Sequence, residues 1–132
     1  MSNAPSNNSK WKLAWKSGEN LPHSAYEKTY ILELPVGWMI KHIFFRNIDF
    51  AHSSLLYMPD KEKTWVSKNM QIEWEKVSRT KNPNFVSDTK RFKTPEGWVV
   101  KEFFTTKKPR QKKGLANLNL IYIEDLFHEW KI

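Results

Sequence analysis

One sequence pattern occurs twice in this chain, sixty positions apart. Residues 35–45 read PVGWMIKHIFF, and residues 95–105 read PEGWVVKEFFT. Repetition of a long pattern at a fixed offset indicates an internal duplication. We therefore expect two copies of one structural unit, with residues 11–69 as the first repeat and residues 70–132 as the second.

The match extends beyond the glycine-tryptophan segment in both directions. LLYMPD at 55–60 corresponds to LIYIED at 120–125, and Trp65 corresponds to Trp130. Upstream, LAW at 13–15 aligns with IEW at 72–74 after a slip of one residue, which leaves Trp11 as the one tryptophan without a counterpart. The order of these matches argues against chance similarity in a tryptophan-rich chain.

The repeated segment predicts a β-hairpin. In the first repeat, residues 29–34 and 37–45 are rich in β-branched and aromatic side chains and flank the turn PVG. Proline suits the first turn position, and Gly37 is expected to adopt the left-handed backbone angle that closes a three-residue loop. In that register Leu34 lies opposite Trp38.

The same register sorts the hairpin side chains into two faces. Tyr30 lies opposite His42 in the first repeat; in the second, Phe92 lies opposite Val100 and Lys90 opposite Glu102. The apolar face of the first hairpin then carries Tyr30, Leu32, Leu34, Trp38, Ile40 and Phe44. The wetter face carries Ile31, Glu33, Met39 and Lys41 in the first repeat and Arg91, Lys93, Val99 and Lys101 in the second.

Two further strands complete each repeat. Alternating polarity at 11–16 and 71–76 predicts a first strand, and the segments 53–58 and 118–123 predict a fourth. A single helical turn is expected after Asp60 and after Asp125, with the carboxylate accepting hydrogen bonds from free backbone N–H groups.

These elements predict an all-β fold. A four-stranded sheet with one apolar face is stable only when that face is covered. We expect two tandem four-stranded antiparallel sheets, related by a pseudo-twofold and packed as a sandwich or joined as a barrel in one shared compact domain. Whether strands exchange between the repeats is open. Residues 1–10 are expected to form a disordered tail.

Composition excludes several classes of function. The chain has 132 residues and no cysteine, so disulfides and thiolate chemistry are ruled out. It has no apolar secretory segment at its start and no apolar stretch long enough to span a membrane, so we expect a cytoplasmic protein with no membrane partner.

Catalytic and metal-binding patterns are also missing. The four histidines, His23, His42, His52 and His128, do not recur at aligned positions and lack metal-ligand spacing. The chain has four glycines and no nucleophile or phosphate-binding motif. The sequence therefore predicts a non-enzymatic protein with no catalytic residue, cofactor or metal site.

Each repeat combines P-x-G-W-x-x-K with a later L-x-Y-x-x-D and a closing tryptophan. This pattern resembles small bacterial hypothetical proteins whose single repeat carries a V-P-G-G-W-L-V-R hairpin and a later F-V-P-D strand. Pro35–Lys41 and Leu55–Asp60 match it best, while the second repeat has Glu124 where that proline falls. The resemblance implies a compact β unit and carries over no site residue.

The polar residues shared by both repeats have two interpretations. Lys41 with Lys101, and Asp60 with Asp125, would form two symmetric half-sites for one ligand. Alternatively, the aspartates cap turns, and the lysines lie on a solvated face with their stems covering nearby aromatics. We favour the second interpretation, and we expect the paired tryptophans to be core residues rather than stacking platforms.

A charged loop distinguishes the second repeat. The chain has a net charge of +8, and the loop after the second hairpin is longer than its counterpart and reads KKPRQKK at 107–113. A basic loop on a duplicated scaffold favours contact with nucleic acid or another polyanion, with little sequence specificity. The predicted binding residues are Lys107, Lys108, Arg110, Lys112, Lys113, Arg91, Lys93 and Lys101.

Two other functions stay open at this stage. The chain could act as a protein-interaction or assembly module through exposed strand edges or through aromatics such as Trp11 and Trp65. Tryptophan platforms could also bind carbohydrate.

Overall fold

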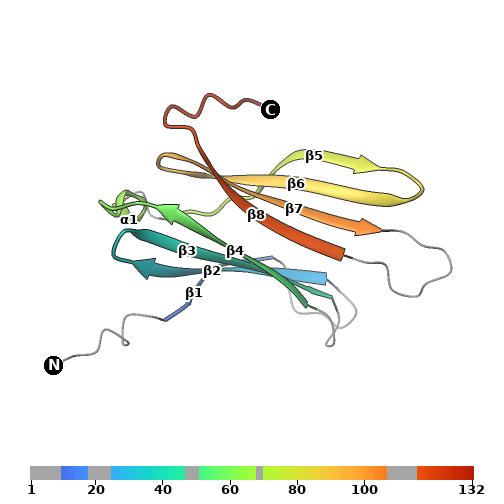
Figure 1. The fold of residues 1–132 in the computed structure, drawn as a ribbon, viewed down its shortest axis with the longest axis horizontal. Helices are drawn as coiled ribbons and strands as arrows, with labels where there is room; N and C mark the ends of the chain where they lie inside the picture. The colour runs from blue at the N-terminus through green and yellow to red at the C-terminus, as the bar shows by residue number, and fades with distance from the viewer. Residues whose placement is uncertain (1–9, 18–24, 47–50, 68–69, 107–115) are drawn as a thin grey trace. The chain divides into compact units, whose positions relative to one another are not determined.

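The computed structural model describes residues 10–17, 25–46, 51–67, 70–106 and 116–132. The chain divides into two compact units, Met1–Gln71 and Ile72–Ile132. The elements of the first unit are β1 (Lys12–Lys16), β2 (Ala25–Leu34), β3 (Gly37–Arg46), β4 (Ala51–Pro59) and α1 (Thr64–Ser67). Those of the second are β5 (Glu75–Lys81), β6 (Phe85–Thr94), β7 (Gly97–Thr106) and β8 (Ala116–Glu124) (Figure 1).

The eight strands form two antiparallel four-stranded sheets, with the orders β1-β2-β3-β4 and β5-β6-β7-β8. The predicted all-β fold with four strands per repeat is confirmed. Each sheet is built from the strands of its own repeat, so the ladders in the described part of the chain show no exchange. The first strand of the second repeat begins later than predicted, because β5 begins at Glu75 rather than at residue 71.

The predicted hairpin register is wrong by one residue. Leu34 pairs with Gly37 and Glu33 with Trp38, so the turn is the two residues Pro35 and Val36. The second hairpin has the same register, with Thr94 paired with Gly97. Successive side chains of a strand point to opposite faces. The shift therefore puts the β2 side chains that were predicted to share a face with Trp38 and Ile40 on the opposite face of the sheet.

The two hairpin glycines have a different role from the one predicted. Neither Gly37 nor Gly97 has a left-handed φ angle. A Cβ atom at Gly37 would lie 2.2 Å from the carbonyl oxygen of Met58, and one at Gly97 would lie 2.0 Å from that of Ile123. Glycine is therefore required at both positions because the backbone of the fourth strand approaches the hairpin closely.

The buried side chains differ between the two sheets. In the first sheet they lie on one face, which carries Thr29, Ile31, Trp38, Ile40, His42, Leu56 and Met58. In the second sheet both faces contain buried residues: Arg91, Trp98 and Val100 on one, and Phe92, Val99, Lys101, Leu118 and Leu120 on the other. In the described part of the chain, no helix is long and apolar enough to cross a membrane.

Candidate functional site

The aspartate after the fourth strand organises the same cluster in each repeat. In the first, Asp60 accepts hydrogen bonds from the indole Nε1 of Trp38 at 2.8 Å and from the backbone N–H groups of Thr64 at 2.8 Å and Trp65 at 3.0 Å. The two indole rings meet edge to face, 5.6 Å apart. We call Trp38, Asp60 and Trp65 the first Trp–Asp–Trp cluster.

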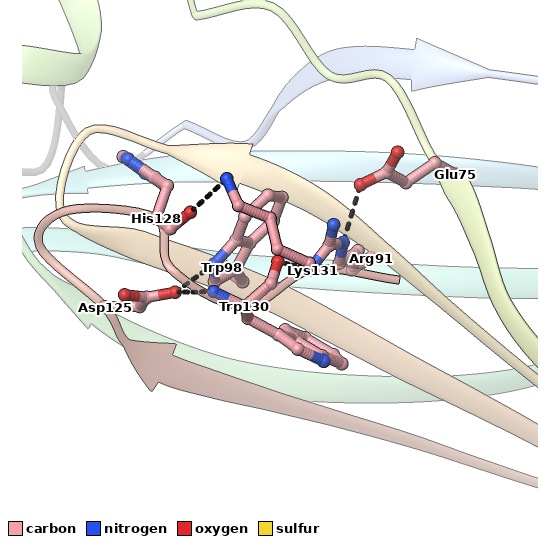
Figure 2. A network of polar contacts seen from close by, with 7 residues as sticks. All are labelled: Glu75, Arg91, Trp98, Asp125, His128, Trp130 and Lys131. Atoms are coloured by element: carbon pink, nitrogen blue, oxygen red, sulfur yellow. Dashed lines mark hydrogen bonds and ion pairs between the residues drawn. The ribbon is translucent and has the colours of Figure 1, made fainter.

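The second Trp–Asp–Trp cluster, Trp98, Asp125 and Trp130, has the same geometry (Figure 2). Asp125 accepts from Trp98 Nε1 and from the backbone N–H groups of Glu129 and Trp130, all at 2.9 Å. The two indole rings are again edge to face, 5.9 Å apart. The predicted role of both aspartates as acceptors for free N–H groups is confirmed. The predicted helical turn forms in the first repeat as α1, whereas the second has a non-helical turn.

These hydrogen bonds lower the pKa of both aspartates. The backbone N–H groups of Glu129 and Trp130, with the Trp98 indole, stabilise the ionised form of Asp125 and lower its pKa to about 2. Burial acts to raise the pKa of Asp60, but the hydrogen bonds from Trp38, Trp65 and Thr64 outweigh it, so that pKa is also lowered. These hydrogen bonds occur in both repeats and close the turn after the fourth strand, so both aspartates have a structural role.

Arg91, a predicted anion-binding residue, lies inside the second cluster (Figure 2). Its guanidinium carbon is 3.7 Å from the ring centroid of Trp98 and 4.5 Å from that of Trp130. It donates from Nε to Glu75 at 2.6 Å and from a terminal nitrogen to the carbonyl oxygen of Trp130 at 2.7 Å. Arg91 is only 5% exposed, so its charge is used within the fold.

The other two predicted binding residues of the second hairpin lie on opposite faces of the second sheet. Lys93 is exposed and pairs with Trp98, on the face that carries Arg91. Lys101 pairs with Lys90 on the opposite face and is 3% exposed, with Nζ 4.2 Å from the ring centroid of Trp74. The prediction of one wet face containing all three is wrong, because the register differs by one residue. Lys107, Lys108, Arg110, Lys112 and Lys113 lie outside the described residues, and their binding role stays a prediction.

The structure also changes the pairing of the tryptophans. Lys12 pairs with Ile31 and Glu75 with Arg91, so the residues just before them, Trp11 and Trp74, are equivalent. Lys41 Nζ lies 4.3 Å from the ring centroid of Trp11, which matches the contact of Lys101 with Trp74. The predicted equivalence of Trp15 with Trp74 is wrong. Trp15 pairs with Thr29, and its equivalent is Ser78, which pairs with Thr89. Both first strands have a bulge at the same point, so the error comes from matching Leu13 with Ile72, whereas Lys12 is equivalent to Glu75.

The side of the first sheet opposite its core is a surface with no fully buried side chain among those described. We call this surface the open face. Its residues share a side because they are cross-strand partners or alternate along one strand. The open face carries Trp11, Leu13, Lys16, Tyr26, Lys28, Tyr30, Leu32, Met39, Lys41, Ile43, Phe45, Ser53, Leu55 and Tyr57.

The charged residues of the open face all have the same sign. Lys16 and Lys28 are direct cross-strand partners, and Lys41 lies one strand further along. Like charges directly opposite one another destabilise a sheet unless an anion compensates them. At the equivalent position the second repeat has Arg79 opposite Asp88, with 3.6 Å between Nε and Oδ1. The described part of the open face has no carboxylate.

Aromatic rings lie next to these lysines. Tyr26 and Phe45 stack with 4.6 Å between centroids and 11° between planes, and Lys28 Nζ is 5.8 Å from each ring. Lys41 Nζ is 5.7 Å from Tyr30 and also contacts Trp11. Tyr57 is 47% exposed. Alternating cations and aromatic rings on an open sheet are typical of surfaces that bind nucleic acid strands.

A hydroxyl, an imidazole and a carboxylate meet on the core side of the same sheet. His42 Nε2 donates to Glu27 Oε1 at 2.8 Å, and His42 Nδ1 lies 2.8 Å from Thr29 Oγ1. Thr29 and His42 are both 0% exposed, so a substrate has no access to the hydroxyl. The described residues contain no group of three His, Asp or Glu side chains that could hold a metal ion.

Comparisons with protein-family models, curated protein sequences and solved structures give no match. The similarity that the structure supports is internal, between two four-stranded sheets of similar size.

Proposed function

We propose that this protein is a non-enzymatic module that binds nucleic acid on the open face of its first sheet. The observation that carries the proposal is the direct opposition of Lys16 and Lys28 on a face without a described carboxylate. A phosphate placed between the two ammonium groups would relieve their repulsion.

Lys41 extends this positive surface across the sheet. It pairs with Tyr30 on one side and with Leu55 on the other, so it lies near the centre of the open face. Lysine contacts with phosphate position a strand and carry no base specificity. Binding is therefore expected to depend on salt and to vary little with sequence.

The test is fluorescence anisotropy with a labelled oligonucleotide over a range of salt concentrations. Three lysine contacts predict a slope of log K against log[salt] of about −2 for a single strand. The double variant Lys16→Gln/Lys28→Gln should bind more weakly and reduce the magnitude of that slope by about 1.4. The matched control is Lys12→Gln/Lys61→Gln, which removes two exposed charges that lie off the open face.

Three results would contradict the proposal. The wild-type protein could show no salt-sensitive binding at low ionic strength, or the control pair could weaken binding as much as the open-face pair. A sulfated glycan could also displace the oligonucleotide with equal affinity, which would indicate a general polyanion site.

A variant neutralised only at the five cations of the 107–113 loop shows whether that segment contributes. Light scattering separates binding from the alternative, self-assembly.

A further inference from the structure

We infer that the open face takes unpaired strands, with two bases stacked on aromatic rings and the phosphate between them held over Lys16 and Lys28. This inference rests on the proposed function and concerns the form of nucleic acid and the way in which it is held. It follows from the order in which aromatic and cationic residues occur along the sheet.

The order along β2 is aromatic, cation, aromatic. Tyr26, Lys28 and Tyr30 alternate with core-facing residues and therefore point to the same side. Successive members are two residues apart, which is about 7 Å along a strand, and the two tyrosines are about 13 Å apart. The lysine row lies midway between the two aromatic positions.

Residues of the neighbouring strands lie beside each of these three positions. Phe45 is the cross-strand partner of Tyr26 and stacks on it, while Lys16 is the partner of Lys28. Beside Tyr30, the Lys41 ammonium lies between that ring and the ring of Trp11. Along the sheet, the paired positions of Lys16 and Lys28 therefore lie between two aromatic positions, and the Lys28 ammonium is 5.8 Å from the Tyr26 and Phe45 rings.

This arrangement favours a single strand over a duplex. In a duplex the bases are paired and stacked inside the helix, so their flat faces are not accessible to side chains. An unpaired strand can place its bases on aromatic rings while its phosphates follow the cations. Binding to a duplex backbone would require only the cations, so the aromatic rings on both sides of the lysine pair favour an unpaired strand.

The second repeat does not reproduce the arrangement. The residues equivalent to Tyr26, Lys28 and Tyr30 are Val86, Asp88 and Lys90. Asp88 forms an ion pair with Arg79, and the neighbouring Lys101 is buried. The inferred strand-binding face is therefore specific to the first repeat.

The experiment compares three labelled probes with the full chain: a short oligothymidylate, an abasic strand of the same length, and a hairpin duplex. We expect the oligothymidylate to bind at least about tenfold more tightly than the abasic strand. Tyr26→Leu and Tyr30→Leu should each weaken binding of oligothymidylate about tenfold, and should leave binding of the abasic strand and the salt slope unchanged. Tyr30→Phe should bind as the wild type does, and Phe127→Leu, at an exposed aromatic outside this face, is the control.

The outcomes separate this inference from the proposed function. If no probe binds, both are overturned. If all three probes bind equally and only Lys16→Gln/Lys28→Gln weakens them, the proposed function stands and the stacking inference is overturned. The comparison of thymidylate with the abasic strand uses wild-type protein, so it holds even if a leucine variant fails to fold.

Discussion

The two repeats share their turns but differ in the faces of their sheets. Both have the glycine that admits the fourth strand, the Trp–Asp–Trp cluster, and a non-glycine residue with positive φ at the same point: Lys63 at 55° and His128 at 51°. On the fourth strands the exposure is reversed. Leu56 and Met58 are 9% and 1% exposed, whereas their equivalents Ile121 and Ile123 are 53% and 36% exposed.

The difference shows which part of the repeat determines its fold. The hydrogen bonds of the Trp–Asp–Trp cluster fix the path of the chain after the fourth strand, and both repeats have them. The strand faces depend on what covers them, and their side chains have diverged. Arg91 replaces Ile31 between the two tryptophans, and Glu102 replaces His42.

The largest expected effect tests whether the shared turns are equivalent. Gly37→Ala and Gly97→Ala should each lower the free energy of unfolding by at least about 3 kcal/mol, because the new Cβ would collide with a backbone carbonyl. Urea unfolding followed by tryptophan fluorescence measures this, with Val36→Ala and Glu96→Ala as controls in the same turns. A large effect in only one repeat would mean that the two turns are not equivalent.

The next prediction exchanges a polar pair between the repeats. His42→Glu should cost about 3 kcal/mol, because it places a carboxylate beside Glu27 at a buried position. The double variant Glu27→Ser/His42→Glu copies the second repeat, where the Ser87 hydroxyl donates to Glu102 at 3.2 Å. It should recover at least half of that loss in urea unfolding. If the loss in the double variant equalled the sum of the losses in Glu27→Ser and in His42→Glu, the two pairs would not be interchangeable.

A smaller effect is expected where Arg91 replaces Ile31. Arg91→Ala should lower the free energy of unfolding by about 2 kcal/mol. It removes the packing of the arginine side chain and its cation–π contacts with Trp98 and with Trp130. Arg91→Ile, which copies the first repeat, should be closer to the wild type, because Glu75 is half exposed and can be solvated without its partner. Thermal unfolding of the two variants measures the difference. If Arg91→Ile were the less stable, the ion pair would matter more than the packing.

The smallest effect concerns pH. Because the folded-state pKa of Asp60 and Asp125 lies below the ordinary value of 3.8, the ionised carboxylates stabilise the fold above about pH 4. That stabilisation is lost as the pH falls toward about 2, where Asp125 becomes protonated in the folded state. Urea midpoints measured over this window should fall with pH. Asp60→Asn should cost about 1 kcal/mol at neutral pH, because it removes the charge from the acceptor of three hydrogen bonds.

Variants of the two aspartates test whether both repeats contribute to the pH dependence of stability. Asp60→Asn and Asp125→Asn should each flatten the dependence, and the double variant should flatten it most. A dependence that survived the double substitution would place the responsible carboxylates elsewhere in the chain.

The amino-acid sequence alone predicted two similar units, the four strands in each and the role of the two aspartates, and the structure has two four-stranded sheets of similar size. These features follow from local chemistry: β-branched runs form strands, and a carboxylate after a strand accepts the free N–H groups of the next turn. The pairing of Trp65 with Trp130 followed from the same local pattern, and the structure confirms their equivalent contacts.

Only the tertiary structure decided the register and therefore the faces. Gly37 is required by the approach of β4, which is distant in sequence, so assigning it to the turn displaced the register by one residue. The bulge in β1 then puts Leu13 and Lys16 on the same side, which a strict alternation of two cannot show. Cross-strand neighbours depend on contacts between distant segments, and for that reason the opposition of Lys16 and Lys28 became visible only in the folded chain.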